Sequence, residues 1–175
     1  LLDAIERAVK DVIKYYPFNA SSALKSAPPF SGGLTHGLVF TDILDRLFQL
    51  TGNKDYLNYA LFLYRDFSGN ILAEDAQFGK ILDTTYRNKE HGVHTYEHLR
   101  PLTMAWVASG NEQLKAALDI YLEKIRQSTT PAGGPIGDEW VGGRHAHATE
   151  TGYEYCSLQE LLDGYTNLLQ KTGEG

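Results

Sequence analysis

A repeated helix ending constrains the fold of this chain more than any other sequence feature. Three stretches with helical spacing of apolar residues end in a threonine or serine followed by a glycine, at Gly52, Gly110 and Gly173. Glycine just past a helix end readily takes the left-handed conformation that terminates the helix. These glycines lie 58 and then 63 positions apart. The spacing predicts a helical hairpin of about 60 residues that occurs roughly three times in the chain.

Helical periodicity dominates the rest of the sequence. Apolar residues recur every three to four positions in six segments, and no segment has the alternating pattern of a confident strand. Pro101 lies inside the fourth segment, so that helix is expected to begin or kink near it. The chain is therefore predicted to be all-α. The six expected helices cover residues 1–16, 37–50, 55–67, 97–108, 111–125 and 156–170.

Stacked helical hairpins form either solenoids or closed α/α toroids. We expect the toroid, with other helical repeats as the alternative. Six hairpins of this length would need about 360 residues, so 175 residues correspond to about half of an (α/α)6 toroid. The chain opens on a second helix without an initiator methionine and stops where another should begin. We therefore expect residues 1–175 to be a single partial domain, truncated at both ends, whose apolar flanks promote self-association.

Charge and hydropathy exclude two classes of partner. A net charge of −6 does not supply the basic stripe that nucleic-acid phosphates require. No apolar run approaches the roughly 18 residues that suggest a membrane span. The single cysteine rules out an intramolecular disulfide. These features leave the compartment open, and a periplasmic or secreted protein is favoured over a cytoplasmic one.

The predicted starts of the hairpins collect polar side chains. Counting back 15 positions from the residue before each repeat glycine gives His36, His94 and Ser157. Equivalent helix starts would share one rim, which presents unpaired N–H groups and the positive helix dipole. Each histidine taken singly is more often a structural or surface residue, but the matching positions favour a functional site. The residues expected on this rim are His36, His91, His94, Glu97, Glu154 and Cys156.

Residues 128–152 form a long glycine-rich stretch without periodicity, which is typical of a functional loop. It contains Glu139 next to Trp140. Burial beside a tryptophan favours the protonated form of a carboxylic acid, as a general acid requires. The indole also offers a flat face to a sugar ring. The alternative is a surface loop pinned by a buried tryptophan.

Glu154 and Cys156 stand two positions apart, where a carboxylate and a thiolate could converge on one metal ion. A buried, inert thiol beside a solvated acid is the alternative. The sequence has no Walker or GxGxxG pattern after a strand, which argues against nucleotide binding, and it has no HExxH motif.

The stretch PAGGPIGDEW, followed 15 residues after Glu139 by the acid of GYEYC, resembles the β-L-arabinofuranosidase-like glycoside hydrolases of the six-hairpin glycosidase superfamily. The resemblance covers roughly residues 31–175 and is most specific in GGPIGDE and EYCSLQELL. It implies that Glu139 is the general acid/base. It also implies that Glu154 and Cys156 are two of four zinc ligands, and that His94 in HGVHT and His36 in THG contact the sugar.

The resemblance also implies a mechanism and a substrate class. The mechanism is retaining hydrolysis of L-arabinofuranosyl or related plant-type glycans through a glycosyl–cysteine intermediate, with zinc keeping the thiolate deprotonated. The nucleophile would be one of a cysteine pair beyond Gly175, so Cys156 is expected to be a ligand only. These 175 residues alone are expected to bind zinc weakly and to hydrolyse nothing.

Two other functions fit the sequence. One is a non-catalytic helical repeat that binds a glycan or a protein on its aromatic rim. The other is a different α/α-toroid enzyme, such as a polysaccharide lyase or a sugar epimerase, with histidine and tyrosine as proton carriers.

Overall fold

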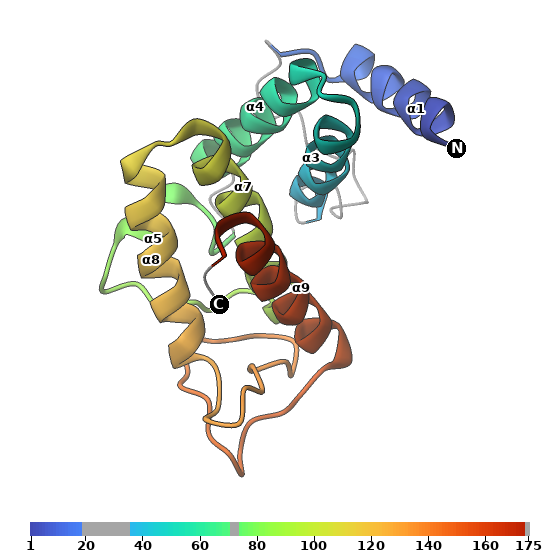
Figure 1. Cartoon of the computed structure of the whole chain (residues 1–175). Helices are drawn as coiled ribbons and strands as arrows, with labels where there is room; N and C mark the ends of the chain where they lie inside the picture. Colours follow the sequence, from blue (N-terminus) through green and yellow to red (C-terminus); the bar gives the residue numbers. More distant parts are fainter. Residues whose placement is uncertain (19–35, 71–73, 174–175) are drawn as a thin grey trace. The chain divides into compact units, whose positions relative to one another are not determined.

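The computed structural model describes residues 1–18, 36–70 and 74–173, which belong to two compact units, Leu1–Ile71 and Leu72–Gly175 (Figure 1). In these ranges the regular secondary structure is helical apart from two isolated β-bridges. The predicted all-α class is thereby confirmed. None of the helices in the described ranges combines the length and the hydropathy needed to cross a bilayer.

The first unit contains a helical hairpin and one further helix. Its elements are α1 (Leu2–Tyr15), the 3-10 helix η1 (Gly37–Val39), α3 (Phe40–Thr51) and α4 (Lys54–Asn70). Leu44 of α3 and Tyr59 of α4 are both fully buried in this unit. The Tyr59 hydroxyl donates to the Tyr16 carbonyl oxygen over 2.7 Å, which ties the end of α1 to α4.

The repeat glycines terminate helices in the way the sequence predicts. Gly52, Gly110 and Gly173 directly follow α3, α7 and α9, with left-handed φ values of 71°, 63° and 75°. Each glycine N–H donates to the carbonyl oxygen four residues earlier, over 2.7 to 2.8 Å. Each helix therefore ends with one carbonyl group of its last turn satisfied by the glycine that follows it.

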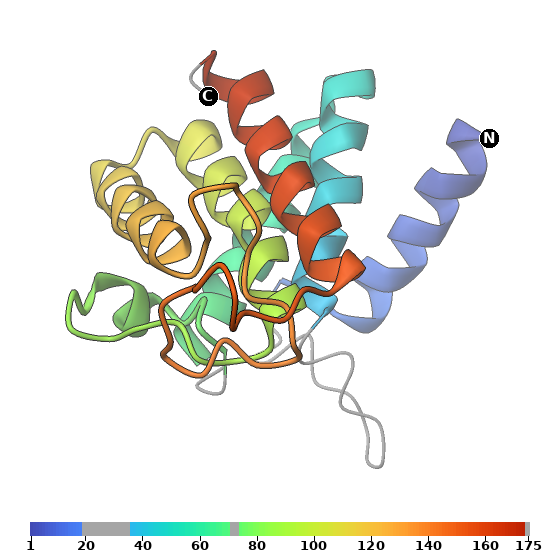
Figure 2. The ribbon, with the colours of Figure 1, turned by 90° about the horizontal axis from the view of Figure 1, so that it is seen from below.

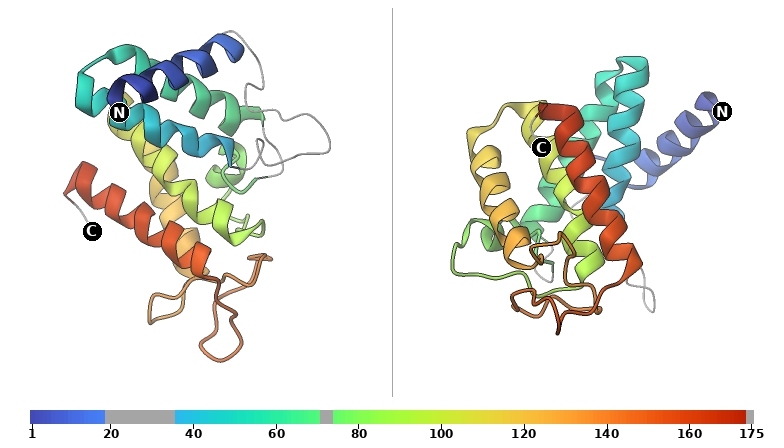
Figure 3. Two further views of the ribbon diagram at one scale, coloured as in Figure 1. Left: turned by 90° about the vertical axis from the view of Figure 1, so that its right-hand side faces the viewer. Right: turned by 60° about the horizontal axis from the view of Figure 1, so that its bottom comes forward.

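The second unit contains α5 (Phe78–Leu82), α6 (Gly92–Glu97), α7 (Leu99–Ser109), α8 (Glu112–Gln127) and α9 (Tyr155–Thr172). Helix α7 packs against both α8 and α9, and Figure 3 shows α9 (red) running alongside α7. Gly164 permits this approach, because a Cβ atom there would lie 3.0 Å from Leu99 Cδ2.

The boundary between α6 and α7 explains the position of Pro101. His98 separates the two helices, and Pro101 occupies the third position of α7. Proline is tolerated in a first helical turn, where its missing N–H has no intrahelical acceptor. The prediction that a helix begins near Pro101 is confirmed.

The long stretch between α8 and α9 contains no helix and lies beside the segment that leads into α6 (Figure 2). Val141 N–H donates to the Glu90 carbonyl oxygen over 3.0 Å, and Gly143 N–H donates to that of Asn88 over 2.9 Å. Ile136 and Val141 are almost completely buried. This loop, residues 128–154, is therefore anchored by two apolar side chains and by backbone pairing.

Candidate functional site

Three segments of the second unit meet at one junction: the start of α6, the loop 128–154 and the start of α9. A Cβ atom on Gly92 would lie 3.0 Å from both the Ile136 carbonyl oxygen and Ser157 Oγ. One on Gly137 would lie 2.7 Å from the Glu154 nitrogen. Glycine allows these close approaches because it has no Cβ. The starts of α6 and α9 therefore lie together, as the prediction of a shared rim requires.

Glu139 sits beside this junction in a strained backbone conformation. Its φ of 74° is the only positive φ of a non-glycine residue in the described ranges. Trp140 N–H donates to the Asp138 carbonyl oxygen over 3.1 Å, which closes a three-residue turn around Glu139. Turns of this kind with positive φ are rare and strained. Strain of about 1–3 kcal/mol persists where the surroundings enforce it, and it is concentrated at functional sites.

The Glu139 carboxylate pairs with a histidine. His91 Nε2 lies 3.1 Å from Glu139 Oε2. The backbone supports this pair, since Gly92 N–H donates to the Glu139 carbonyl oxygen over 2.8 Å, and His91 forms an antiparallel bridge with Trp140. The sequence placed His91 on the predicted rim but gave it no role of its own.

Two further histidines continue from His91. The His91 and His94 ring centroids lie 4.7 Å apart, and those of His94 and His98 lie 6.4 Å apart. His94 Nδ1 lies 3.5 Å from Oε1 of the buried Glu74. The sequence spacing of His91, His94 and His98 places the three rings on one side of the starts of α6 and α7. The His91 ring is partly exposed, and the His98 ring is fully buried.

Asp75 supports the segment that carries these histidines, although no sequence pattern singled it out. Its carboxylate is buried and accepts the Tyr86 hydroxyl over 2.8 Å and the Thr95 hydroxyl over 2.8 Å. It also accepts the backbone N–H groups of Lys89 and Glu90 at 3.0 Å. Asp75 thus holds the N–H groups of the segment before His91, while the loop 128–154 pairs with the carbonyl groups of the same segment.

Arg144 joins two parts of the loop by hydrogen bonds, and we call this contact with Asp138 the clasp. Its guanidinium donates to both carboxylate oxygens of Asp138 and to the Trp140 carbonyl oxygen. This hydrogen bonding holds the pKa of Asp138 below its ordinary value. The clasp spans Glu139 and Trp140, so it contributes to holding the strained turn.

Exposure of the loop residues differs from two sequence expectations. The Glu139 side chain is 69% exposed, so Trp140 does not bury it as a desolvated acid. Trp140 itself is 56% exposed. The alternative of a buried tryptophan that pins the loop is therefore wrong, because Ile136 and Val141 do the anchoring instead. The exposed indole lies nearly perpendicular to the His91 ring, with ring centroids 5.8 Å apart.

Glu154 and Cys156 are the two residues predicted to bind zinc. Glu154 directly precedes α9, and its Oε2 atom is buried without a hydrogen-bond partner among the described residues. Cys156 is exposed, so the alternative of a buried, inert thiol is wrong. A carboxylate with an unsatisfied oxygen and an accessible thiol suit zinc chemically. However, the described residues bring no third ligand to them, since no group of three candidate ligands occurs there.

His36 belongs to the first unit, where it directly precedes η1 and is exposed. Its role in sugar binding stays a prediction.

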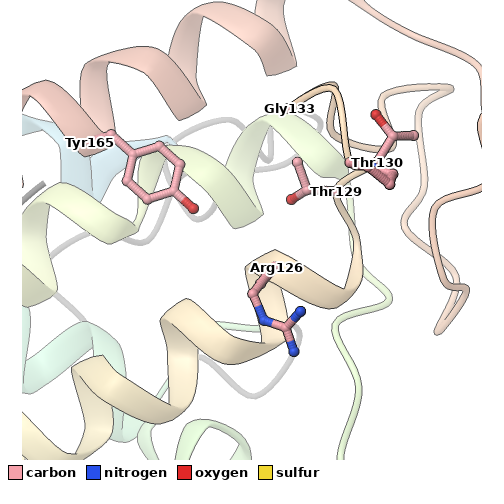
Figure 4. A pocket seen from close by; sticks show the side chains of 6 residues that line it. Arg126, Thr129, Thr130, Gly133 and Tyr165 are labelled. Atoms are coloured by element: carbon pink, nitrogen blue, oxygen red, sulfur yellow. The ribbon is translucent and has the colours of Figure 1, made fainter.

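A separate cavity of about 430 Å³ lies where α8 leads into the loop 128–154 (Figure 4). Figure 4 shows the Tyr165 ring of α9 projecting toward Arg126 at the end of α8 and toward Thr129. None of the predicted site residues lines this cavity. We therefore build the candidate site on the exposed junction around Glu139. Comparison of the chain with protein-family models, with curated proteins and with solved structures finds no match in any of the three.

Proposed function

We propose that this chain carries the acid–base part of a glycoside hydrolase that acts on L-arabinofuranosyl or related plant-type glycans. The observation that carries this proposal is the Glu139–His91 pair. An exposed carboxylate in a strained turn contacts a histidine and has an exposed tryptophan as its neighbour. Strain retained at an accessible carboxylate is expected where that carboxylate does chemistry.

The residues around Glu139 divide the work of binding and proton transfer. Glu139 protonates the leaving glycosidic oxygen and then accepts a proton from the attacking water. The exposed face of Trp140 offers an apolar surface for a sugar ring. His94, the partner of Glu74, is the proposed polar contact to the sugar.

Zinc enters the proposal through Glu154 and Cys156. These residues would supply two of four ligands, and a bound zinc ion would keep a cysteine thiolate deprotonated. The unsatisfied Glu154 oxygen supports this assignment. The remaining ligands and the nucleophile would come from outside the described residues, so Cys156 keeps the role of a ligand.

The direct test replaces Glu139 by glutamine in the full-length protein and measures hydrolysis of aryl arabinofuranosides. We expect kcat to fall by about 100-fold or more, because the amide cannot exchange the required proton. His145→Ala, an exposed substitution in the same loop, is the matched control and should leave turnover unchanged. Unchanged turnover in Glu139→Gln would remove Glu139 as acid/base and favour the non-catalytic glycan- or protein-binding repeat.

A second candidate function is a polysaccharide lyase or sugar epimerase that uses histidine as proton carrier. The buried Glu74 carboxylate beside His94 Nδ1 favours it, since a carboxylate at one ring nitrogen orients a histidine for proton transfer at the other. His94→Gln separates the two functions. Under the hydrolase proposal Glu139→Gln is the more damaging change, whereas under the lyase or epimerase proposal His94→Gln is.

We also propose that the second unit associates with a second copy of this chain through α9. An apolar stripe on this helix is exposed, and it consists of Leu158, Leu162, Tyr165 and Leu169. When the sequences of α7 and α9 are aligned at Gly110 and Gly173, Leu162 takes the position of Leu99. Leu99 is fully buried against α9. In α7 this face is covered by α9. The equivalent face of α9 is exposed, and a second copy of this chain could cover it in the same way.

A further inference from the structure

The contact between His91 and Glu139 is built into the backbone. The two residues come from different segments, and the antiparallel bridge between His91 and Trp140 joins those segments. On either side of the pair, Gly92 N–H donates to Glu139 and Val141 N–H donates to Glu90, over 2.8 and 3.0 Å. The side-chain contact is therefore set by paired main chains and does not depend on two long side chains meeting by chance on the surface.

His91 is the fixed member of the pair. Its side chain is 20% exposed, against 69% for that of Glu139. Its ring contacts the tilted ring of His94 and lies nearly perpendicular to that of Trp140. An imidazole held on two sides presents its Nε2 atom in one direction, so it can hold one oxygen of a more exposed carboxylate in place.

Burial also favours one position for the proton of His91. Its Nδ1 atom is buried and has no hydrogen-bond partner among the described residues. An N–H group at that position would lose its hydrogen bond to water without replacement, which costs more than leaving a bare lone pair there. The neutral ring therefore carries its proton on Nε2, the atom that faces Glu139 Oε2.

We propose that His91 is a positioning residue for Glu139: its Nε2–H donates to Oε2 and leaves Oε1 as the oxygen that exchanges a proton with the bound ligand. This inference rests on the proposed acid/base role of Glu139. In the acid step the Oε1–H bond breaks, its electron pair stays on Oε1, and the proton goes to the leaving glycosidic oxygen. In the second step water returns a proton to Oε1. The Nε2–H donor remains on Oε2 in both states.

The first test observes the contact itself and needs no activity. In the 15N-labelled chain at neutral pH, two-bond correlations should show His91 with Nε2 protonated and Nδ1 unprotonated. The exposed His145 serves as the reference and should show the averaged signals of exchanging tautomers. Protonation of His91 at Nδ1, or averaging like that of His145, would overturn the proposal.

Variants at Glu139 sharpen this test. Glu139→Gln keeps a side-chain oxygen as acceptor, so the His91 Nε2 proton should still exchange slowly with solvent. Glu139→Ala removes the acceptor, and that proton should exchange at least about tenfold faster. Equal exchange in the two variants contradicts a hydrogen bond between Nε2 and the residue at position 139.

The second test asks whether the contact matters for turnover in the full-length protein. His91→Phe keeps a ring but removes the donor, and we expect kcat to fall about 10- to 100-fold with little change in KM. His91→Gln keeps an N–H donor and should recover part of that loss. Circular dichroism of both variants checks that they are folded. If His91→Phe is not folded, the tautomer and proton-exchange measurements at His91 decide the matter.

The outcomes separate this inference from the proposed function. Normal kcat in a folded His91→Phe protein, where Glu139→Gln is inactive, overturns the positioning role and leaves the hydrolase proposal standing. Full activity of Glu139→Gln overturns the hydrolase proposal and the catalytic part of this inference, while the tautomer measurement still decides whether the contact exists.

Discussion

At the scale of single residues, the conformation of Glu139 is the most informative feature. Glycine would occupy a φ of 74° without strain, and asparagine or aspartate would do so more easily than glutamate. The chain nevertheless has glutamate there, between a clasped Asp138 and an exposed Trp140. A side chain kept at a conformational cost is expected to make an interaction that glycine cannot make. The contact between the Glu139 carboxylate and His91 is such an interaction.

The cost of this conformation can be measured by comparing two substitutions. Glu139→Gly and Glu139→Ala both remove the carboxylate and its contact with His91, but only alanine retains a Cβ. We expect the glycine variant to have a free energy of unfolding about 1 kcal/mol higher than the alanine variant. Urea denaturation of both proteins measures the difference. An alanine variant as stable as the glycine variant would mean that position 139 is not strained.

At the scale of elements, the loop 128–154 is held in place in two ways. Its apolar anchors and backbone pairing join it to the segment before α6, whereas the Arg144–Asp138 clasp closes its tip. The anchors contain no ionisable group. The clasp depends on an ionised Asp138, so it should open in acid.

The pH dependence of the clasp follows from the lowered pKa of Asp138, which Arg144 causes. Because the folded pKa lies below the unfolded one, the clasp contributes fully above the unfolded value of about 4. Its contribution is lost as the pH falls through the folded value. We expect the indole NMR signal of Trp140 to change in this acidic window, and Arg144→Gln to move the change to higher pH.

Arg126→Gln provides the matched control for this titration. Arg126 forms a similar pair with Glu123 on α8, and that contact lowers the pKa of Glu123 to about 2. Removing Arg126 should leave the Trp140 signal and its pH dependence as they are in the unsubstituted chain. A shift of equal size in both variants would mean that the signal reports net charge and not the clasp.

At the scale of the whole molecule, the chain consists of two compact units, each with its own buried core. In the second unit α7 is covered on two sides, by α8 and α9, while α9 leaves its apolar stripe exposed. Exposed leucines at helical spacing are costly in water unless something covers them. Self-association of the chain through α9 is the proposed consequence.

Self-association through α9 can be tested with one charge. Leu162, which is 61% exposed, lies in the middle of the stripe. We expect Leu162→Glu to weaken association at least about tenfold, because it removes apolar contact and buries a charge at the interface. Gln170→Glu adds the same charge to α9 outside the stripe and should have no such effect. Sedimentation equilibrium measures both, and a chain that is monomeric at every concentration contradicts the proposal.

The sequence alone determined the features that depend on neighbouring residues. Helical periodicity, the left-handed glycines at Gly52, Gly110 and Gly173, and the helix boundary near Pro101 follow from local backbone geometry and side-chain spacing, and the structure confirms them. Glycines and the absence of periodicity likewise predicted the long loop. Each of these depends on interactions within about one helical turn.

Only the tertiary structure decided how the candidate site is assembled. His91 and Glu139 are 48 residues apart in sequence, and Thr95 meets Asp75 across 20 residues. The sequence named Glu139 and Trp140 but wrongly expected the acid to be buried, because exposure depends on which side chains anchor the loop. Ile136 and Val141 take the buried positions, and this leaves Glu139 and Trp140 at the surface beside His91. Partner choice and burial arise from packing between distant segments, which local spacing does not encode.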